Sequence, residues 1–200
     1  MTTLIFASHN KNKAAEINAL TEPNIHISTL NEVGISDEIA ETAQTLEGNA
    51  LIKARFARQK TGKACFADDT GLEVEVLGGE PGVYSARYAG EDCNSENNID
   101  KLLSKLSNAT NRKARFRTVV AYISADGKEH LFEGIVEGQI AHKRAGSNGF
   151  GYDAVFIPTD DNINPNGTLT FAQMDLTVKN QISHRARAIS KFVEFIANEH

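Results

Sequence analysis

The sequence predicts a mixed α/β fold, and two observations lead to this class. Segments with helical periodicity alternate along the chain with short apolar or alternating segments that are typical of strands. Two of the strand-like segments flank Asp126-Gly127, a dipeptide that favours the tight turn of an antiparallel hairpin. We therefore do not expect a purely parallel sheet. The 200 residues contain no internal repeat and no linker-like tract, so we expect a single domain over residues 1–200.

Strands and loops follow from the apolar pattern and from turn-forming residues. Strand character is found at residues 3–7, 64–77, 115–124, 131–140 and 154–157. Within residues 64–77 we expect Asp68-Asp69-Thr70-Gly71 to interrupt the strand. Glycine, proline, asparagine and aspartate predict a loop at residues 78–82 and an exposed loop at residues 159–167.

Helices are predicted from residue type, periodicity and capping residues. Good helix formers cover residues 11–20 and 45–61, and the second segment ends at Gly62, a favoured C-terminal stop. Ser95 and Ser183 are expected to cap two further helices. Their apolar faces are Ile99, Leu102, Leu103 and Leu106 in the first, and Ile189, Phe192, Val193 and Ile196 in the last.

Composition narrows the classes of partner. The formal net charge is −5, and a polyanion draws much of its affinity from a basic surface, so no nucleic-acid partner is expected. No apolar run approaches the roughly 20 residues of a membrane-spanning helix, and residues 1–7 resemble a first strand more than a signal peptide. The two cysteines provide no disulfide framework and no CxxC zinc pair, which favours the reducing cytoplasm.

The first candidate site is the polar segment from Ser8 to Lys13, placed between a strand and a helix start. Free backbone N–H groups and the positive helix end attract anions there, and Lys11 and Lys13 add charge. The segment lacks the glycines of a Walker loop. Taken alone, the segment is better described as a solvated helix cap than as a phosphate site.

The second candidate combines adjacent carboxylates with a helical lysine. Asp68 and Asp69 repel each other unless a cation compensates, and Mg²⁺ prefers carboxylates together with phosphate oxygens. An Asp-Gly turn in solvent is the alternative. Asn49 and Lys53 stand at i and i+4, so both project from one helix face, where Lys53 can meet a phosphate or simply be solvated.

Two later segments offer aromatic and basic groups. Gly149-Phe-Gly-Tyr-Asp153 places flat rings beside glycines, which suits base stacking or a glycine bend before a core strand. Lys179 and Ser183-His184-Arg185 lie near a helix N-terminus, where basic residues run against the dipole preference and so favour a functional role over a plain cap.

These motifs together closely resemble the inosine triphosphate pyrophosphatase family, also described as XTP/dITP diphosphatases or non-canonical purine NTP pyrophosphatases. The matching blocks occur in order along essentially the whole chain. They are Ser8-x-Asn10-x-x-Lys13, Glu41, Asn49-Ala-x-x-Lys53-Ala, Asp68-Asp-Thr-Gly-Leu72, Pro81-Gly-Val-Tyr-Ser-Ala-Arg-Tyr88, Gly149-Phe-Gly-Tyr-Asp153, Thr170-Phe-Ala172, Lys179, and Ser183-His-Arg-Ala186.

The resemblance implies a mixed, elongated central sheet flanked by helices, with two lobes, a central active-site cleft and a homodimer. It implies Mg²⁺-dependent hydrolysis of deaminated purine nucleoside triphosphates (ITP, dITP and XTP) to monophosphate and pyrophosphate, which cleanses the nucleotide pool. Asp69 would be the catalytic proton acceptor and, with Glu41, a metal ligand. The implied substrate-binding residues are Ser8, His9, Asn10, Lys11, Asn12, Lys13, Lys53, Thr70, Phe150, Gly151, Tyr152, Asp153, Lys179, His184 and Arg185.

Selectivity is expected to come from the purine 6-position. Donors from Arg185 and nearby backbone would pair with the carbonyl of inosine or xanthosine and be left unpaired by adenine. Two positions depart from the family pattern: Gly48 stands where glutamate is frequent, and the loop at residues 160–168 is longer than expected.

Two other functions fit these residues less well. A Maf-like nucleotide pyrophosphatase would prefer other bases, and the blocks at Phe150–Asp153 and His184-Arg185 argue against it. A catalytically silent nucleotide-binding protein would bind ITP without releasing pyrophosphate. The intact carboxylates and lysines argue against that.

Overall fold

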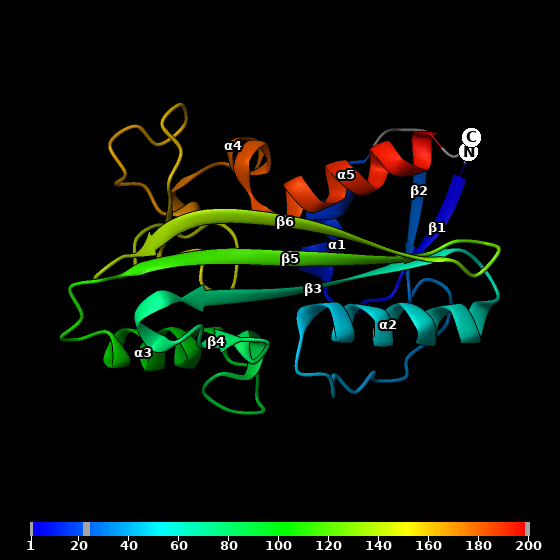
Figure 1. The fold of residues 1–200 in the computed structure, drawn as a ribbon, viewed down its shortest axis with the longest axis horizontal. Coiled ribbons are helices and arrows are strands. Elements are labelled where there is room, and N and C mark those ends of the chain that lie inside the picture. The colour runs from blue at the N-terminus through cyan, green and yellow to red at the C-terminus, as the bar shows by residue number, and fades with distance from the viewer. Residues whose placement is uncertain (1, 22–24, 199–200) are drawn as a thin grey trace. The chain divides into compact units, whose positions relative to one another are not determined.

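The computed structural model describes residues 2–21 and 25–198 (Figure 1). The elements in chain order are β1 (Thr2–Phe6), α1 (Lys11–Asn18), β2 (Ile25–Thr29), α2 (Leu46–Thr61), β3 (Cys65–Val74), β4 (Pro81–Gly82), α3 (Ser95–Lys105), β5 (Lys113–Ile123), β6 (Glu129–Ile140), β7 (Phe156–Pro158), α4 (Leu176–Ile182) and α5 (His184–Asn198). Short 3-10 turns occur at Glu75–Leu77, Ser85–Arg87 and Phe171–Gln173. The α/β class predicted from the sequence is confirmed.

The strands form one mixed sheet in the order β2-β1-β3-β5-β6-β7, with β4 paired to β3. β1 runs parallel to both β2 and β3, whereas β3 and β4, and likewise β6 and β7, are antiparallel. The mixed sheet agrees with the prediction drawn from the Asp126-Gly127 hairpin signal, since β5 and β6 flank that dipeptide and are neighbours in the sheet.

The chain divides into two compact units, and it passes from one to the other at four places along the sequence. Unit 1 comprises residues 1–69, 118–134 and 185–200, and unit 2 comprises residues 70–117 and 135–184. β3 therefore begins in unit 1 and passes into unit 2 after Asp69. The prediction of one domain over residues 1–200 stays a prediction.

The core of unit 1 lies between its strands and the helices α1 and α5; Figure 1 shows α5 above the strands and α2 below them. Phe6 stacks on Phe66 with ring centroids 5.0 Å apart, and Phe66 in turn contacts Phe192 of α5 at 4.9 Å. On the other side, Ala54 and Ala57 of α2 are fully buried, because small side chains let the helix approach the sheet.

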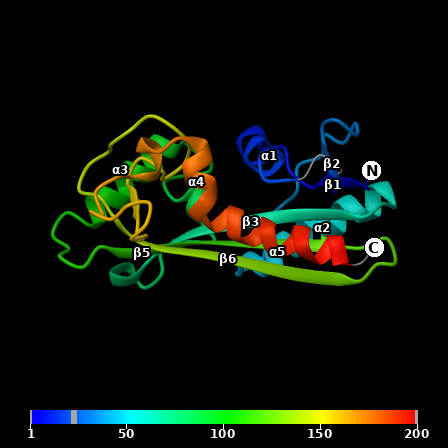
Figure 2. The ribbon, with the colours of Figure 1, turned by 90° about the horizontal axis from the view of Figure 1, so that it is seen from above.

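The core of unit 2 is built around Phe116, Phe156 and Phe171. The rings of Phe116 and Phe156 have centroids 4.6 Å apart, and those of Phe156 and Phe171 5.3 Å apart. Helix α3 adds Ile99 and Leu102 from its apolar face, as predicted. Figure 2 shows α3 and α4 from above.

Several local predictions need correction. The expected interruption at residues 68–71 is wrong, because β3 is continuous from Cys65 to Val74. The third helix is capped by Asn94, whose side chain accepts from the N–H groups of Glu96 and Asn97, and not by Ser95. The stop of α2 at Gly62 is confirmed by its left-handed φ of 68°. β2 and α4 were not predicted.

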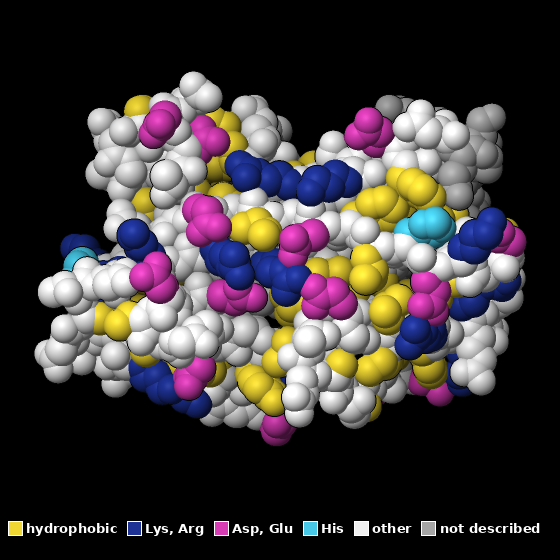
Figure 3. All heavy atoms as spheres, viewed as in Figure 1, with side chains coloured by type: hydrophobic (Ala, Val, Ile, Leu, Met, Phe, Trp, Pro, Cys, Tyr) yellow, Lys and Arg dark blue, Asp and Glu magenta, His cyan; other side chains and the backbone are white. Residues whose placement is uncertain are grey.

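The surface carries charges of both signs. Figure 3 shows basic and acidic side chains interspersed on one face of the molecule. This pattern offers no broad basic area on that face for a polyanion. Within the described residues, every helix is too short or too polar to cross a bilayer.

Candidate active site

Two adjacent carboxylates at the end of the unit 1 part of β3 organise the site. Successive side chains of a strand point to opposite faces of the sheet, so Asp68 and Asp69 face different helices. Asp68 contacts Lys13 of α1 and Arg185 of α5, whereas Asp69 contacts Lys53 of α2. The like charges that were expected to repel are thus each matched by cations on their own face.

Asp69 shares a lysine with Glu41. Lys53 Nζ donates to Asp69 Oδ1 at 2.8 Å and to Glu41 Oε1 at 2.6 Å, while Asn49 Nδ2 lies 3.4 Å from Asp69 Oδ2. The i, i+4 spacing of Asn49 and Lys53 does place both on the buried face of α2, as predicted. Burial raises the pKa of Asp69, and Glu41 adds to this, although Lys53 and Lys13 act against it.

The carboxylates of Asp69 and Glu41 stabilise the charged form of Lys53. Burial alone would lower the pKa of Lys53, but Asp69 and Glu41 outweigh it and raise that pKa, so the ammonium stays charged. Two carboxylates that hold one buried cation also suit a divalent cation, because Mg²⁺ takes one or two carboxylates and fills its other positions with water and phosphate oxygens. Among the described residues, no group of three or more His, Cys, Asp or Glu side chains is arranged to hold a metal alone.

Asp68 belongs to a second, more deeply buried network. Its Oδ1 accepts from Lys13 Nζ at 3.0 Å and its Oδ2 from Arg185 Nε at 3.2 Å, and Arg185 Nη1 donates to Glu16 of α1. Burial would raise the pKa of Asp68, but Lys13 and Arg185 hold it well below its usual range. Adjacent aspartates thus have pKa values shifted in opposite directions, a pattern that separates an ionised anchor from an acid–base group.

The Ser8–Lys13 segment forms the turn that leads into α1. Asn10 is the N-cap, and its Oδ1 accepts from the N–H groups of Asn12 and Lys13 at 3.0 and 3.1 Å. The expectation of free N–H groups is therefore wrong for these two residues. Lys11 and Asn12 are exposed, whereas Lys13 is half-buried, and burial lowers the pKa of Lys13 despite the nearby Asp68. Lys13 is the member of this segment that joins the carboxylate cluster.

A separate group of predicted residues lies in unit 2. Lys179 Nζ donates to Asp153 Oδ2 at 2.7 Å, and the same carboxylate oxygen accepts from the Phe150 N–H at 2.9 Å. Both members of this ion pair are at least 95% buried. The Lys179 ammonium also lies 5.4 Å from the centre of the Phe150 ring. Asp153 thus fixes both the glycine-rich turn and the lysine.

The remaining predicted residues of unit 2 occupy defined places. The Tyr152 hydroxyl donates to the Ser85 carbonyl at 2.9 Å, and His184 is buried with its ring 4.6 Å from that of Phe116. Gly151 follows Phe150 in the turn, and Thr70 stands on β3 directly after Asp69. That all of these residues contact a substrate stays a prediction.

The sequence analysis did not predict a role for Glu16 or the structural role of the Asn49 side chain. Glu16 lies three residues after Lys13 on α1, and that spacing is the signal that places both on one helix face. Its pairing with Arg185 had no signal, because the two residues are far apart along the chain. Asn49 belongs to a predicted family block, and its carboxamide contacts both Asp69 and the Ala43 N–H.

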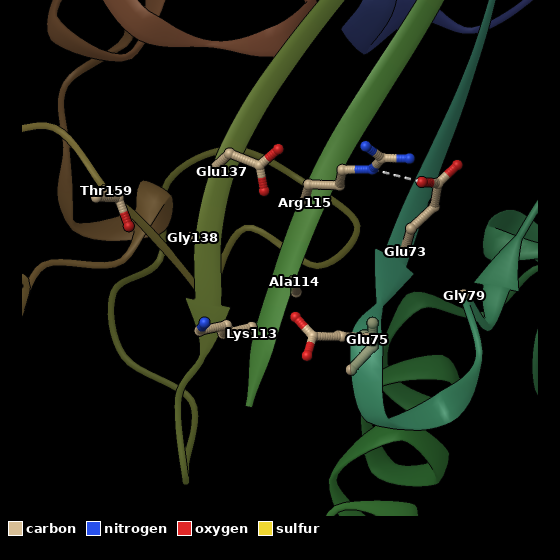
Figure 4. A pocket seen from close by; sticks show the side chains of 10 residues that line it. Glu73, Glu75, Gly79, Lys113, Ala114, Arg115, Glu137, Gly138 and Thr159 are labelled. Carbon is tan, nitrogen blue, oxygen red and sulfur yellow. Dashed lines mark hydrogen bonds and ion pairs between the residues drawn. The ribbon is translucent and has the colours of Figure 1, made fainter. Parts of the chain in front are cut away.

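A cavity of about 470 Å³ lies in unit 2 but contains none of the predicted site residues. Figure 4 shows Glu73 and Arg115 joined by an ion pair on neighbouring strands of its wall, with Lys113, Glu75 and Glu137 nearby. Its charged side chains are solvated and of mixed sign, which gives no defined chemistry.

Fold and site together define an α/β protein with a buried carboxylate–lysine cluster suited to metal-assisted phosphate chemistry. Comparison with known proteins gives the particular family. The chain belongs to the Ham1 family, whose model matches residues 4–195.

Relatives and solved structures agree with this membership. Two proteins named dITP/XTP pyrophosphatase, from Porphyromonas gingivalis and Flavobacterium psychrophilum, are 52% and 49% identical to this chain; each alignment covers 98% of it, and 98% and 99% of the relatives. The Ham1 protein of Staphylococcus aureus has a solved structure that matches with a TM-score of 0.87 and 40% identity over 100% of both chains. A HAM1 protein from Coxiella burnetii matches with a TM-score of 0.87 at 34% identity, covering 99% of this chain and 100% of that one.

Proposed function

We propose that this protein hydrolyses deaminated purine nucleoside triphosphates, namely dITP, XTP and ITP, to the monophosphate and pyrophosphate. The observation that carries the proposal is the cluster of Glu41, Lys53 and Asp69 in a chain that belongs to the Ham1 family. Relatives that match nearly the whole chain are named for dITP and XTP. Family membership also favours this function over a Maf-like pyrophosphatase.

Asp69 is the proton acceptor in the proposed reaction. Burial raises its pKa towards the working pH, which improves a carboxylate as a general base. A water molecule that attacks the α-phosphorus gives its proton to Asp69, the bond from the α-phosphorus to the bridging oxygen breaks, and pyrophosphate leaves. Lys53 and Lys13 carry positive charge that stabilises the negative charge on the phosphate oxygens.

Glu41 and Asp69 are the residues that would hold Mg²⁺. Both carboxylates already hold the Lys53 ammonium, so their arrangement accommodates a cation. When bound, Mg²⁺ supplies neutralisation of phosphate charge and helps to orient water. Magnesium dependence is thus part of the proposal.

We assign base recognition to the predicted residues on the strength of the resemblance. In unit 2, Asp153 fixes Lys179 and the Phe150 turn, which favours a preorganised surface for a purine. Arg185 has Asp68 and Glu16 as partners, and this favours an electrostatic role beside any contact with the purine carbonyl. The resemblance also supports a homodimer, and the free cysteines are compatible with action in the cytoplasm.

Pyrophosphate release from a panel of triphosphates tests the function. We expect rapid release from ITP, dITP and XTP in the presence of Mg²⁺, and slow release from ATP, GTP and UTP. Removal of Mg²⁺ should abolish release. Asp69→Asn should fold normally, bind ITP and lose on the order of 10²-fold or more in turnover. Binding of ITP without pyrophosphate release by the wild type would instead support a silent nucleotide-binding protein.

A further inference from the structure

The segment of residues 31–44 connects β2 to α2 and carries Glu41, yet it has little structure of its own. Residues 35–43 lack regular secondary structure, and most side chains between residues 31 and 44 are exposed. Segments with few buried apolar contacts are those that open most easily in a fold. The position of Glu41 therefore depends on bonds that fasten this segment from outside.

His9 provides one such fastening with both of its ring nitrogens. Nδ1 lies 2.9 Å from Asn31 Oδ1, and Nε2 lies 3.0 Å from the Asp37 carbonyl oxygen. A carbonyl only accepts, so Nε2 donates to Asp37; Nδ1 of the neutral ring then accepts, which requires the Asn31 carboxamide to turn its NH2 group towards the ring. A phosphate oxygen would have to break one of these bonds to reach the ring, so the geometry fits an anchor better than a phosphate ligand.

The chain just after Glu41 is hydrogen-bonded to the start of α2. Asn49 Oδ1 accepts from the Ala43 N–H at 2.9 Å. A Cβ at Gly48 would meet the Ala43 Cβ at 2.5 Å. Because Gly48 stands where the family frequently has glutamate and carries no Cβ, the segment can lie close against the helix. Glu41 thus sits between two held points, Asp37 and Ala43.

We propose that His9 is a positioning residue that holds Glu41 beside Asp69 for the metal, and that it is not a ligand of the triphosphate. This inference rests on the proposed function, since it assigns the metal to Glu41 and Asp69. His9 directly precedes Asn10, the cap of α1, and so links the turn that presents Lys13 to the segment that presents Glu41.

Metal affinity is the decisive measurement, with Mn²⁺ as the probe and free Mn²⁺ followed by electron paramagnetic resonance. Loss of residues that orient metal ligands commonly weakens binding about 10-fold to 100-fold, and we expect about 10-fold for His9→Ala. His9→Gln should recover much of the affinity, because its amide can donate to the Asp37 carbonyl. His26→Ala, at an exposed histidine of β2, is the matched control and should leave Mn²⁺ affinity unchanged.

A double-mutant cycle shows whether His9 acts through Glu41. If it does, His9→Ala should add little to the loss of Mn²⁺ affinity already caused by Glu41→Gln. Hydrogen exchange of residues 31–44 without metal or nucleotide should be faster in His9→Ala. In ITP hydrolysis, the variant should need more Mg²⁺ while its KM at saturating Mg²⁺ stays near that of the wild type.

Other outcomes would overturn the positioning role of His9. A raised KM for ITP at saturating Mg²⁺ would make His9 a substrate ligand, and unchanged Mn²⁺ affinity or full additivity with Glu41→Gln would remove the positioning role. If His9→Ala fails to fold, Asn31→Ala removes one of the two bonds without altering the turn and should give part of the affinity loss. A wild type that releases no pyrophosphate would refute the proposed function, while Mn²⁺ binding and exchange would still decide the role of His9.

Discussion

Replacing Glu16 with glutamine removes one negative charge from the buried network that holds Asp68. The side chains of Arg185 and Glu16 are only 3% and 6% exposed, so the guanidinium cannot recover its lost partner from water. Removing one partner of a buried ion pair costs about 3–5 kcal/mol. Arg185 keeps Asp68 at 3.2 Å, and glutamine keeps an acceptor oxygen, so we expect the lower end of that range.

Urea unfolding of Glu16→Gln measures this cost against a matched control. At about 2 kcal/mol per M urea, a loss of about 3 kcal/mol lowers the midpoint by about 1.5 M. Glu129→Gln makes the same chemical change at the Arg55–Glu129 pair, where the side chains are 57% and 37% exposed. There we expect about 1 kcal/mol or less. Equal losses in the two variants would refute the view that burial makes the Glu16 charge matter.

Three further outcomes are expected. Lys13 and Arg185 hold the pKa of Asp68 below its usual 3.8. The contribution of the ionised Asp68 to stability is therefore complete above about pH 4 and is lost as the pH falls through the lowered pKa. In urea unfolding, the free energy of unfolding of Asp68→Asn should decline less steeply below about pH 4 than that of the wild type. Burial raises the pKa of the Cys65 thiol to about 12, so the native protein should react with a disulfide reagent at pH 8 only at exposed Cys93, and a second equivalent before unfolding would contradict this. Tyr152→Phe leaves the buried Ser85 carbonyl without its donor and should cost about 1–2 kcal/mol in thermal unfolding, with an unchanged midpoint as the opposing result.

Local patterns in the sequence were sufficient for much of the fold. Gly62 ended α2 as predicted, because a glycine in the left-handed region is a local requirement of the helix end. The hairpin around Asp126-Gly127 was also predicted correctly, because its turn depends on local residues in the same way. The continuity of β3 was missed, because Asp68 and Asp69 read as turn residues until Lys13, Lys53 and Arg185, which come from other elements, neutralise them.

The candidate site was predictable as a set of residue types and less so as a set of contacts. Helical spacing placed Asn49 and Lys53 on one face, and the structure bears this out. The spacing of Glu16 from Lys13 indicated only a shared helix face, and the burial of Glu16 could not be predicted, since it depends on Arg185, a residue distant along the chain. For the same reason, the pairing of His9 with Asp37 could not be read from the motif that contains His9.

The alternation of β3 has a practical meaning for protein engineering. A single peptide unit sends Asp68 and Asp69 to opposite faces of the sheet, so each has its own hydrogen-bonded partners, while Lys13 and Lys53 each also act electrostatically on the aspartate of the opposite face. A substitution on α2 would therefore change the direct contacts of Asp69, whereas Asp68 would keep its contacts with Lys13 and Arg185 and would sense the change only as a longer-range charge effect. Deleting one residue upstream in the strand would exchange the two sides, giving each carboxylate the other's surroundings.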